Sequence, residues 1–241
     1  MPLEAVIFDW GGTLSVFASL EMIDVWTLAA EHLAPERVNE VRDHLVAVEQ
    51  SIWDRVAEDQ RPATLAEILA LASQQLGLDV AEAVLEEAAV RHLDSWTPHI
   101  VHDDDAAPTL RAIREQGFKT GLLSNTHWPR SFHEHFLDRD GLTDLLDVRC
   151  YTSEMERTKP HASAFRHVLD ALEVDDPAAA VFVGDRPYDD VFGALRSGLR
   201  GVLRTNPMVP SYDVEPSAVI DRLPELLPLL ATWRAEAGTT R

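Results

Sequence analysis

The sequence predicts an α/β protein: a doubly wound, mainly parallel sheet with an inserted α-helical domain. Two observations lead to this fold class. Short apolar runs rich in β-branched residues recur along the chain, and each is followed by polar residues, as in the buried strands of parallel sheets. Between residues 15 and 97, by contrast, apolar residues recur at spacings of three and four, which is the helical period. A chain of 241 residues is long enough for a core with a smaller insert.

The first strand is predicted at Val6-Ile7-Phe8 and ends at Asp9. In an open parallel sheet the carboxyl ends of the strands border the ligand crevice, so Asp9 is expected to face that crevice. Gly11 and Gly12 follow, and such a pair allows a tight turn and a close approach of the backbone to a ligand. We therefore expect the functional site to form around this stretch.

A helical insert is predicted after the first strand. Thr64 and Glu67 have the spacing of a capping box, and Asp79 is expected to cap the following helix. About eighty residues of helical pattern exceed what a simple crossover between neighbouring strands requires. The predicted domains are a sheet core of residues 1–14 and 98–241 and a helical domain of residues 15–97.

Two later strands end in residues that suit an anion. The apolar run 118–123 leads into Ser124-Asn125, where a hydroxyl can donate a hydrogen bond into the crevice. Lys159-Pro160 follows the run 148–151. The proline is expected in the first turn of a helix, which would place the lysine just before a helix N-terminus, a position that favours phosphate-like anions.

A further strand end suits a cation. The run 180–184 leads into Asp185, Asp189 and Asp190. Three acids within six residues repel one another unless a cation compensates, and oxygen-only ligands suit Mg²⁺. The remaining elements are predicted as strands at 201–203 and 218–220 and a helix at 223–233.

Composition limits the partners. A net charge of −20 argues against nucleic acid and against an anionic membrane, because no basic surface can dominate. The only lysines are Lys119 and Lys159, so a site for an anionic substrate needs a metal ion or a few placed cations. The single cysteine, Cys150, lies in a predicted strand as a buried thiol. No signal sequence and no apolar run near the ~20 residues of a membrane span is found, so we expect a cytoplasmic monomer or homodimer.

In this order and spacing, the four strand ends resemble the four motifs of the haloacid dehalogenase-like hydrolase superfamily. The motifs are Val6-Ile7-Phe8-Asp9-Trp10-Gly11-Gly12-Thr13, then Leu122-Leu123-Ser124-Asn125, then Lys159-Pro160, then Val183-Gly184-Asp185 through Asp190. The resemblance covers about residues 3–14 and 98–225. It implies a Rossmann-like core, and it identifies the helical insert with the helical cap of this family.

The resemblance also implies an activity, that of a Mg²⁺-dependent phosphatase acting on a small phosphorylated metabolite. Asp9 would be the nucleophile and form an aspartyl-phosphate, and with an ordinary pKa of ~4 it would be ionised at neutral pH. Ser124 and Lys159 would hold the transferring group. Mg²⁺ would be held by Asp9, by the backbone carbonyl of Gly11, by Asp185 and by Asp190. The register, counted from Asp185 to the Gly193-Ala194 pair, favours Asp190 over Asp189. Substrate contacts are expected from Gly11, Gly12, Thr13, Asn125 and His127.

One departure from the family pattern concerns Gly11. The phosphatases of the family usually carry a second Asp there, which protonates the leaving alcohol and later activates water. A general acid–base group of this kind contributes roughly 10²–10⁴ in rate. His127 lies three residues after Ser124 and is one candidate for a substitute acid.

This departure leaves three other readings open. A phosphonatase has a similar first motif but needs a lysine in the cap for a Schiff base, and residues 15–98 contain none. A haloacid dehalogenase needs no acid, because halide leaves without a proton, but it has Tyr at the position of Gly11 and no metal site. A non-catalytic protein that binds phosphate could retain the same motifs.

Substrate identity lies in the helical insert, whose pattern shows no polar signature. Residues that are candidates for lining the crevice are His44, Trp53, Arg55 and Trp96 in the insert, and Trp10 and Trp128 beside the motifs.

Overall fold

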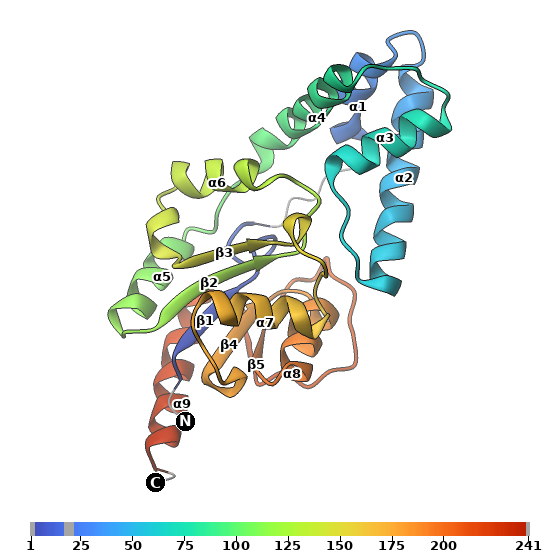
Figure 1. Ribbon diagram of the computed structural model, residues 1–241. Helices are drawn as coiled ribbons and strands as arrows, with labels where there is room; N and C mark the ends of the chain where they lie inside the picture. Colours follow the sequence, from blue (N-terminus) through green and yellow to red (C-terminus); the bar gives the residue numbers. More distant parts are fainter. Residues whose placement is uncertain (1–2, 17–21, 240–241) are drawn as a thin grey trace.

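The computed structural model describes residues 3–16 and 22–239. Within them, six parallel strands form one sheet in the order β3-β2-β1-β4-β5-β6 (Figure 1). The strands are β1 (Ala5–Phe8), β2 (Lys119–Ser124), β3 (Val148–Tyr151), β4 (Ala180–Gly184), β5 (Arg200–Arg204) and β6 (Ala218–Ile220). The predicted α/β class with a doubly wound parallel sheet is therefore confirmed.

The strand order reverses between β1 and β4. From β1 the chain builds outwards through β2 to β3, then crosses to β4 and continues through β5 to β6 on the other side. In such a sheet the ligand crevice lies outside the carboxyl ends of the strands at the reversal. The residues that follow β1 and β4 are Asp9 and Asp185, so the reversal brings these two acids to the same point.

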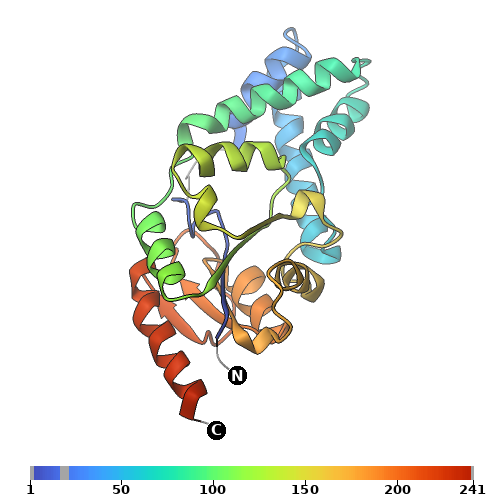
Figure 2. The ribbon, with the colours of Figure 1, turned by 60° about the vertical axis from the view of Figure 1, so that its left-hand side comes forward.

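Helices cover both faces of the sheet. One face carries α5 (Ala106–Glu115), α6 (Arg130–Arg139) and α9 (Leu226–Thr239), and the other carries α7 (Ala162–Ala171) and α8 (Gly193–Arg196). In Figure 2, the red α9 and the green α5 lie side by side. Alternate residues of a strand point to opposite faces, so a strand covered on both faces has to be apolar throughout. In β1, Val6 and Phe8 pack with the first group and Ile7 with the second.

Four further helices form a separate group, called here the helical unit. They are α1 (Met22–Leu33), α2 (Val38–Asp59), α3 (Leu65–Gln75) and α4 (Glu82–Trp96). Their buried apolar side chains, among them Trp26, Leu45 and Ile68, make a hydrophobic cluster of their own. Figures 1 and 2 both show the unit beyond one end of the sheet. The helical periodicity of this stretch is confirmed, and the division into two domains stays a prediction. Residues 1–2, 17–21 and 240–241 of the predicted domains lie outside the described residues.

Two short linkers join the helical unit to the sheet and pair with each other. Ser15 forms an antiparallel bridge with His102. Val16 N donates to Val101 O at 2.8 Å, beside this bridge. The entry and exit of the helical unit are thus held together next to the loop that follows β1.

The helical unit also contacts loops at the carboxyl end of the sheet. Leu65 N donates to the carbonyl of His127 at 2.8 Å, in the loop after β2. Thr158 N, in the loop after β3, donates to the carbonyl of Gln60 at 2.9 Å. These contacts place α2 and α3 over the end of the sheet that carries the predicted motifs.

Some element boundaries differ from the predictions for local reasons. The capping box of Thr64 and Glu67 is present. However, α4 begins after Ala81, so Asp79 does not cap it. Likewise, α7 begins after His161, whose ring nitrogen accepts from the Ser163 N–H, so a competing cap leaves Pro160 outside the helix. The prediction that Pro160 lies in the first turn of this helix is therefore wrong, and Lys159 lies three residues before the first residue of α7.

One helix, α6, was not predicted. Only four of its ten residues are buried, and charged residues dominate the rest, so its apolar stripe is a weak signal. Among the helices of the described residues, none combines the length and the apolar character that crossing a bilayer requires.

Candidate active site

A buried lysine lies at the centre of the predicted site. Lys159 Nζ donates to Asp9 Oδ1 and to Asp190 Oδ1, both at 2.6 Å. The side chains of all three residues are at most 7% exposed. Residues separated by as many as 150 positions in the sequence therefore meet in one buried ion-pair network. Charge-assisted bonds of this length are among the stronger hydrogen bonds in proteins.

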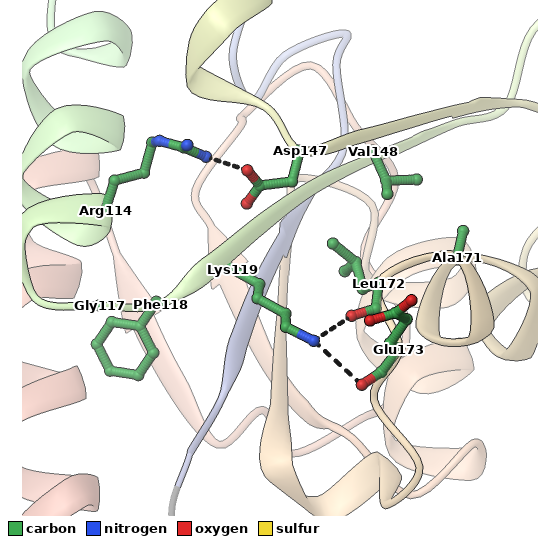
Figure 3. A pocket seen from close by; sticks show the side chains of 9 residues that line it. All are labelled: Arg114, Gly117, Phe118, Lys119, Asp147, Val148, Ala171, Leu172 and Glu173. Carbon is green, nitrogen blue, oxygen red and sulfur yellow. Dashed lines mark hydrogen bonds and ion pairs between the residues drawn. The ribbon is translucent and has the colours of Figure 1, made fainter.

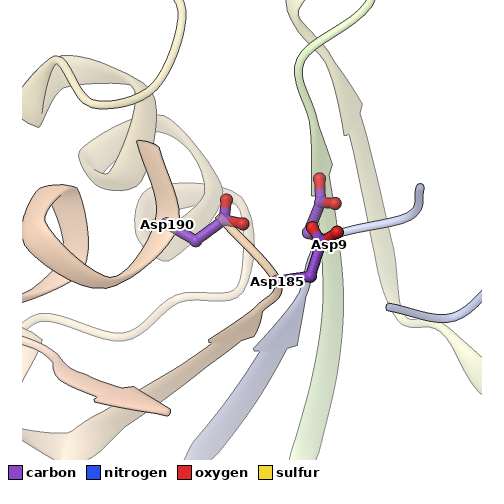
Figure 4. A group of neighbouring side chains, drawn as sticks. All are labelled: Asp9, Asp185 and Asp190. Carbon is purple, nitrogen blue, oxygen red and sulfur yellow. The ribbon is translucent and has the colours of Figure 1, made fainter. Parts of the chain in front are cut away.

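Three carboxylates surround a common point. Asp9 and Asp185 project from neighbouring strand ends, and Asp190 points toward them from the π-helical turn η5 (Pro187–Phe192) (Figure 4). One oxygen from each lies within 4.8 Å of the others. Asp185 Oδ2 accepts from Asn206 Nδ2 at 2.6 Å, whereas the buried Asp185 Oδ1 has no hydrogen-bond partner. An unpartnered buried carboxylate oxygen among oxygen donors fits a hard divalent cation such as Mg²⁺.

Two glycines make this cluster possible. Gly12 has φ +77°, and a Cβ there would lie 2.1 Å from Asp185 Oδ2. At Gly184 a Cβ would lie 2.3 Å from the Asp190 carboxyl carbon. Neither position tolerates a side chain without moving an acid. At Gly11, by contrast, a Cβ would meet no atom within 4 Å.

Burial destabilises the charged form of the carboxylates in the site, so a positive charge beside them is stabilising. Burial raises the pKa of Asp9, and the Lys159 ammonium opposes that shift without cancelling it. Burial, followed by the charges of Asp9 and Asp190, raises the pKa of Asp185 to about 7. Burial disfavours the charged Lys159, but the charges of Asp190 and Asp9 outweigh it and raise the pKa of this lysine. The expectation that Asp9 has an ordinary pKa is therefore wrong, because a desolvated carboxylate is costly.

The structure brings Asp190 into the carboxylate cluster and leaves Asp189 outside it. Asp190 is fully buried, and its Oδ2 also accepts from the Arg186 N–H at 2.9 Å. Asp189 is half-buried beside it, and burial raises the pKa of Asp189 to about 6. The register that favoured Asp190 thus agrees with its position.

The residues of the second motif take different positions. Ser124 is buried at the end of β2. Asn125 Oδ1 accepts from the Lys159 N–H, and its Nδ2 donates to the Lys159 carbonyl, both at 2.9 Å. The amide of Asn125 therefore positions Lys159, whereas the sequence suggested a substrate contact. Thr13, after Gly12, is fully buried with an unpartnered hydroxyl.

His127 lies between the sheet and the helical unit. Its ring is buried, and Nε2 lies 3.5 Å from Glu49 Oε1 on α2. Burial lowers the pKa of His127 to about 4, so the ring is neutral near pH 7. A neutral imidazole is a poor general acid, which weighs against His127 as the substitute for the missing Asp.

Of the residues proposed to line the crevice, two lie against the loop of His127. The Trp53 ring lies 5.6 Å from the His127 ring, and the Trp96 ring lies 5.0 Å from the Trp128 ring. His44 instead bonds to Gln75, and Arg55 pairs with Asp59 on the surface of α2.

Two residues of this region were missed by the sequence reasoning. Asn206 follows β5, and the same rule of polar residues at strand ends would have found it. Glu49 had no sequence signal, because it is one acid among several on an amphipathic helix.

A surface pocket of about 470 Å³ lies elsewhere, at the amino end of β2 (Figure 3). Its cations are already engaged. Arg114 pairs with Asp147 at 2.5 Å, and Lys119 Nζ donates to the carbonyls of Leu172 and Glu173 at 2.6 and 3.1 Å. The pocket lies at the opposite end of the strand from Ser124, so it is not part of the site.

Sequence comparison supports the family. The sequence profile of haloacid dehalogenase-like hydrolases matches residues 3–198. A glyceraldehyde 3-phosphate phosphatase of Methanopyrus kandleri is 30% identical over 64% of this chain and 67% of its own length. A phosphonoacetaldehyde hydrolase of Bordetella avium is 29% identical over 76% of this chain and 65% of its own length. The chain spans 40–52% of the length of two other glyceraldehyde 3-phosphate phosphatases.

Structural comparison agrees. A 2-haloacid dehalogenase from Pseudomonas syringae pv. Tomato DC3000 superposes with a TM-score of 0.74 at 24% identity, over 96% of this chain and 99% of that one. At this identity the likeness shows the fold alone. The profile match, in contrast, spans all four motifs. The protein is therefore a hydrolase that belongs to the haloacid dehalogenase-like family.

Proposed function

We propose that the protein is a Mg²⁺-dependent phosphatase that acts on a small phosphorylated metabolite through an aspartyl-phosphate at Asp9. The observation that carries this proposal is the position of Asp9. Asp9 Oδ1 accepts a hydrogen bond from Lys159 Nζ at 2.6 Å. One oxygen of Asp9 also lies within 4.8 Å of one oxygen from each of two further carboxylates. A similar phosphatase, named for glyceraldehyde 3-phosphate, agrees with this class of substrate.

In the proposed reaction an oxygen of Asp9 forms a bond to phosphorus while the bond to the leaving alcohol breaks. The alkoxide takes a proton and departs. Water then attacks the same phosphorus, the bond to Asp9 breaks, and inorganic phosphate and the free carboxylate are released. Lys159 and Ser124 hold the phosphoryl oxygens as charge develops on them. Asp9, Asp185, Asp190 and the carbonyl of Gly11 would hold Mg²⁺, which would supply positive charge to offset that of the transferring group.

The proton for the leaving alcohol is assigned to solvent. The space beside Gly11 would meet no atom within 4 Å of an added Cβ, so water has room there. His127 is neutral near pH 7 and holds no proton to spare as an imidazolium. This favours substrates whose leaving group needs little protonation.

The helical unit is proposed to act as the family's cap. Its contacts to His127 and to Thr158 place it over the loops that carry the motifs. Covering an active site in this way limits the access of bulk water and strengthens the electrostatic interactions within it.

The phosphonatase reading has little support in the residues, although a phosphonoacetaldehyde hydrolase is among the relatives. Its Schiff base would need a free lysine. Lys119 caps the end of α7 far from the site, and Lys159 is buried between two carboxylates. The dehalogenase reading has the fold in its favour but leaves the cluster of Asp9, Asp185 and Asp190 unexplained.

The experiment is release of p-nitrophenol from p-nitrophenyl phosphate with and without Mg²⁺. We expect turnover that requires Mg²⁺ and that falls at least ~10³-fold in Asp9→Asn, because the nucleophile is lost. Asp104→Asn, the same change at an exposed acid, is the matched control and retains the wild-type rate. Halide release from 2-haloacids without metal would instead support a dehalogenase, and silence in both assays a binding protein.

A further inference from the structure

The loop that follows β5 contacts the carboxylate cluster. We call it the β5 loop: residues 205–212. β5 pairs with β4 in parallel, with Leu203 opposite Gly184, so the two strands end side by side. Asp185 follows β4 directly, and Asn206 lies in the β5 loop. The register of two neighbouring strands therefore brings Asn206 beside Asp185.

Asn206 donates the only side-chain hydrogen bond that the described residues give to the Asp185 carboxylate. Its Nδ2 lies 2.6 Å from Asp185 Oδ2. Its Oδ1 accepts from the Met208 N–H at 3.0 Å. An amide turned by half a rotation would set its oxygen against a carboxylate oxygen and its NH₂ group against an N–H, so both bonds would be lost. The bond within the β5 loop therefore holds the Asn206 amide with its nitrogen toward Asp185.

The two oxygens of Asp185 have different surroundings. Oδ2 is bonded to Asn206, and a Cβ added at Gly12 would lie 2.1 Å from it, so the backbone of the first motif also packs against this oxygen. Oδ1 is buried and has no hydrogen-bond partner. Oδ2 is thus engaged within the protein, and Oδ1 is the oxygen left for a ligand.

Asn206 fixes the rotation of the Asp185 carboxylate. The terminal torsion of an aspartate is broad and roughly two-fold, so the torsion alone does not decide which oxygen faces the cluster. Asp9 and Asp190 are held by their bonds to Lys159 at 2.6 Å, whereas Asp185 is bonded to Asn206 instead. The amide therefore orients the third carboxylate as the ammonium orients the other two.

The β5 loop also contacts η5, the turn that carries Asp190. The ring of Tyr212 lies 4.9 Å from the ring of Tyr188 and 5.5 Å from that of Phe192, and both of these residues belong to η5. Tyr188 and Phe192 stack on each other at 5.4 Å. The β5 loop is therefore anchored on both parts of the fourth motif.

A carboxylate that offers one oxygen suits Mg²⁺ better than Ca²⁺. Ca²⁺ takes about six to eight oxygens in flexible geometry and accepts one or both oxygens of a carboxylate, whereas Mg²⁺ demands a near-ideal octahedron. The two oxygens of one carboxylate lie too close together to fill two corners of an octahedron. Engagement of Asp185 Oδ2 by Asn206 therefore acts against the coordination that Ca²⁺ can use and Mg²⁺ cannot.

We propose that Asn206 is a positioning residue of the metal site, which holds Asp185 so that Oδ1 alone is offered to the ion and which thereby favours Mg²⁺ over Ca²⁺. The proposal rests on the Mg²⁺ site of the phosphatase proposed above. It adds a residue outside the four motifs, whose role is to discriminate between two ions of equal charge. Loss of a group that orients a metal ligand typically weakens metal binding roughly 10–100-fold.

The test is the binding of Mg²⁺ and of Ca²⁺, each alone, to the full chain freed of metal with a chelator and measured by isothermal titration calorimetry. In Asn206→Ala we expect the Kd for Mg²⁺ to rise at least about tenfold and that for Ca²⁺ less than about threefold, because Ca²⁺ can take both oxygens of a freed Asp185. Asn206→Leu keeps most of the volume without the donor and should shift both constants in the same way, so it decides the question if Asn206→Ala does not fold. Asn39→Ala, at an exposed position on α2, is the matched control and keeps both constants.

An unchanged Kd for Mg²⁺ in a folded variant would overturn the proposal. An equal rise for both ions would overturn it as well, since general damage to the site weakens both. If the wild-type chain binds no Mg²⁺, this proposal fails together with the Mg²⁺-dependent phosphatase. If it binds Mg²⁺ but releases no p-nitrophenol from p-nitrophenyl phosphate, only the phosphatase proposal fails, and the two dissociation constants still decide this one.

Discussion

At the scale of single residues, two neighbouring glycines have different reasons to be glycine. Gly12 has a positive φ, and its missing Cβ leaves room for the Asp185 carboxylate. Gly11 has neither constraint, because an added Cβ meets nothing within 4 Å. The absence of a side chain at Gly11 is therefore a chemical feature of the site and not a packing requirement.

This difference predicts a gain of activity in Gly11→Asp. If solvent protonates the leaving group, an acid placed at Gly11 should raise kcat for glycerol 3-phosphate at least tenfold, a modest part of the ~10²–10⁴ that a general acid contributes. The rate on p-nitrophenyl phosphate should rise far less, because nitrophenolate needs no proton. Gly11→Asn has the same shape without the acid and should give no gain. Equal effects of Asp and Asn in steady-state kinetics would contradict solvent protonation.

At the scale of elements, the loop after β2 holds the loop after β3 in place. Asn125 makes two hydrogen bonds to the backbone of Lys159, one as acceptor and one as donor. The ammonium of Lys159 is buried between two acids. It keeps that position only if the backbone of Lys159 is held in place. A residue of the second motif thus sets the geometry of the third.

Asn125→Ala should lower both stability and activity. Two backbone groups of Lys159 lose their partners, which should reduce the free energy of unfolding by about 1–3 kcal/mol in urea titrations. Phosphatase activity should fall with it, as Lys159 loses its fixed position. Asn39→Ala, at an exposed position on α2, is the control and should change neither quantity. Wild-type stability in Asn125→Ala would show that these bonds contribute nothing net.

At the scale of the whole molecule, three histidines are buried in neutral form, His92 and His127 where the two halves meet and His133 against β3. Burial lowers the pKa of His92 to about 3, that of His127 to about 4 and that of His133 to about 3. In the unfolded chain each titrates near 6.5. Between these values only the unfolded chain takes up the protons, so each histidine lowers the stability as the pH falls from about 6.5 toward 4. Buried acids with raised pKa values, such as Asp185, act in the opposite direction over part of this range.

His92→Asn should therefore make stability less dependent on pH. Its ring Nδ1 bonds to the carbonyl of Val25 at 3.1 Å, a bond that an Asn amide can imitate without titrating. Between pH 7 and pH 5 the variant should lose about 2 kcal/mol less than the wild type, since 1.5 pH units below 6.5 correspond to that difference. Urea unfolding at both pH values measures it. The exposed His167→Asn should behave like the wild type, and a similar pH dependence in His92→Asn would mean that His92 titrates in the fold.

The sequence by itself determined which residues gather at one edge of the sheet. Continuous apolar runs are typical of strands that are covered on both faces of a parallel sheet. Parallel strands have their carboxyl ends at the same edge of the sheet. Asp9, Ser124 and Asp185 come at such strand ends, so they had to lie near one another. The same pattern placed a long helical segment between the first two strands.

Only the tertiary structure decided how these residues meet. The register favoured Asp190 over Asp189, but that the Asp190 carboxylate also bonds to Lys159 is decided by the packing of the π-helical turn against the loop after β3. The bonds of Asn125 to Lys159 and the approach of Glu49 to His127 join loops and helices far apart in the chain. Such contacts depend on how whole elements pack, and a pattern of local residue types carries no information about that packing.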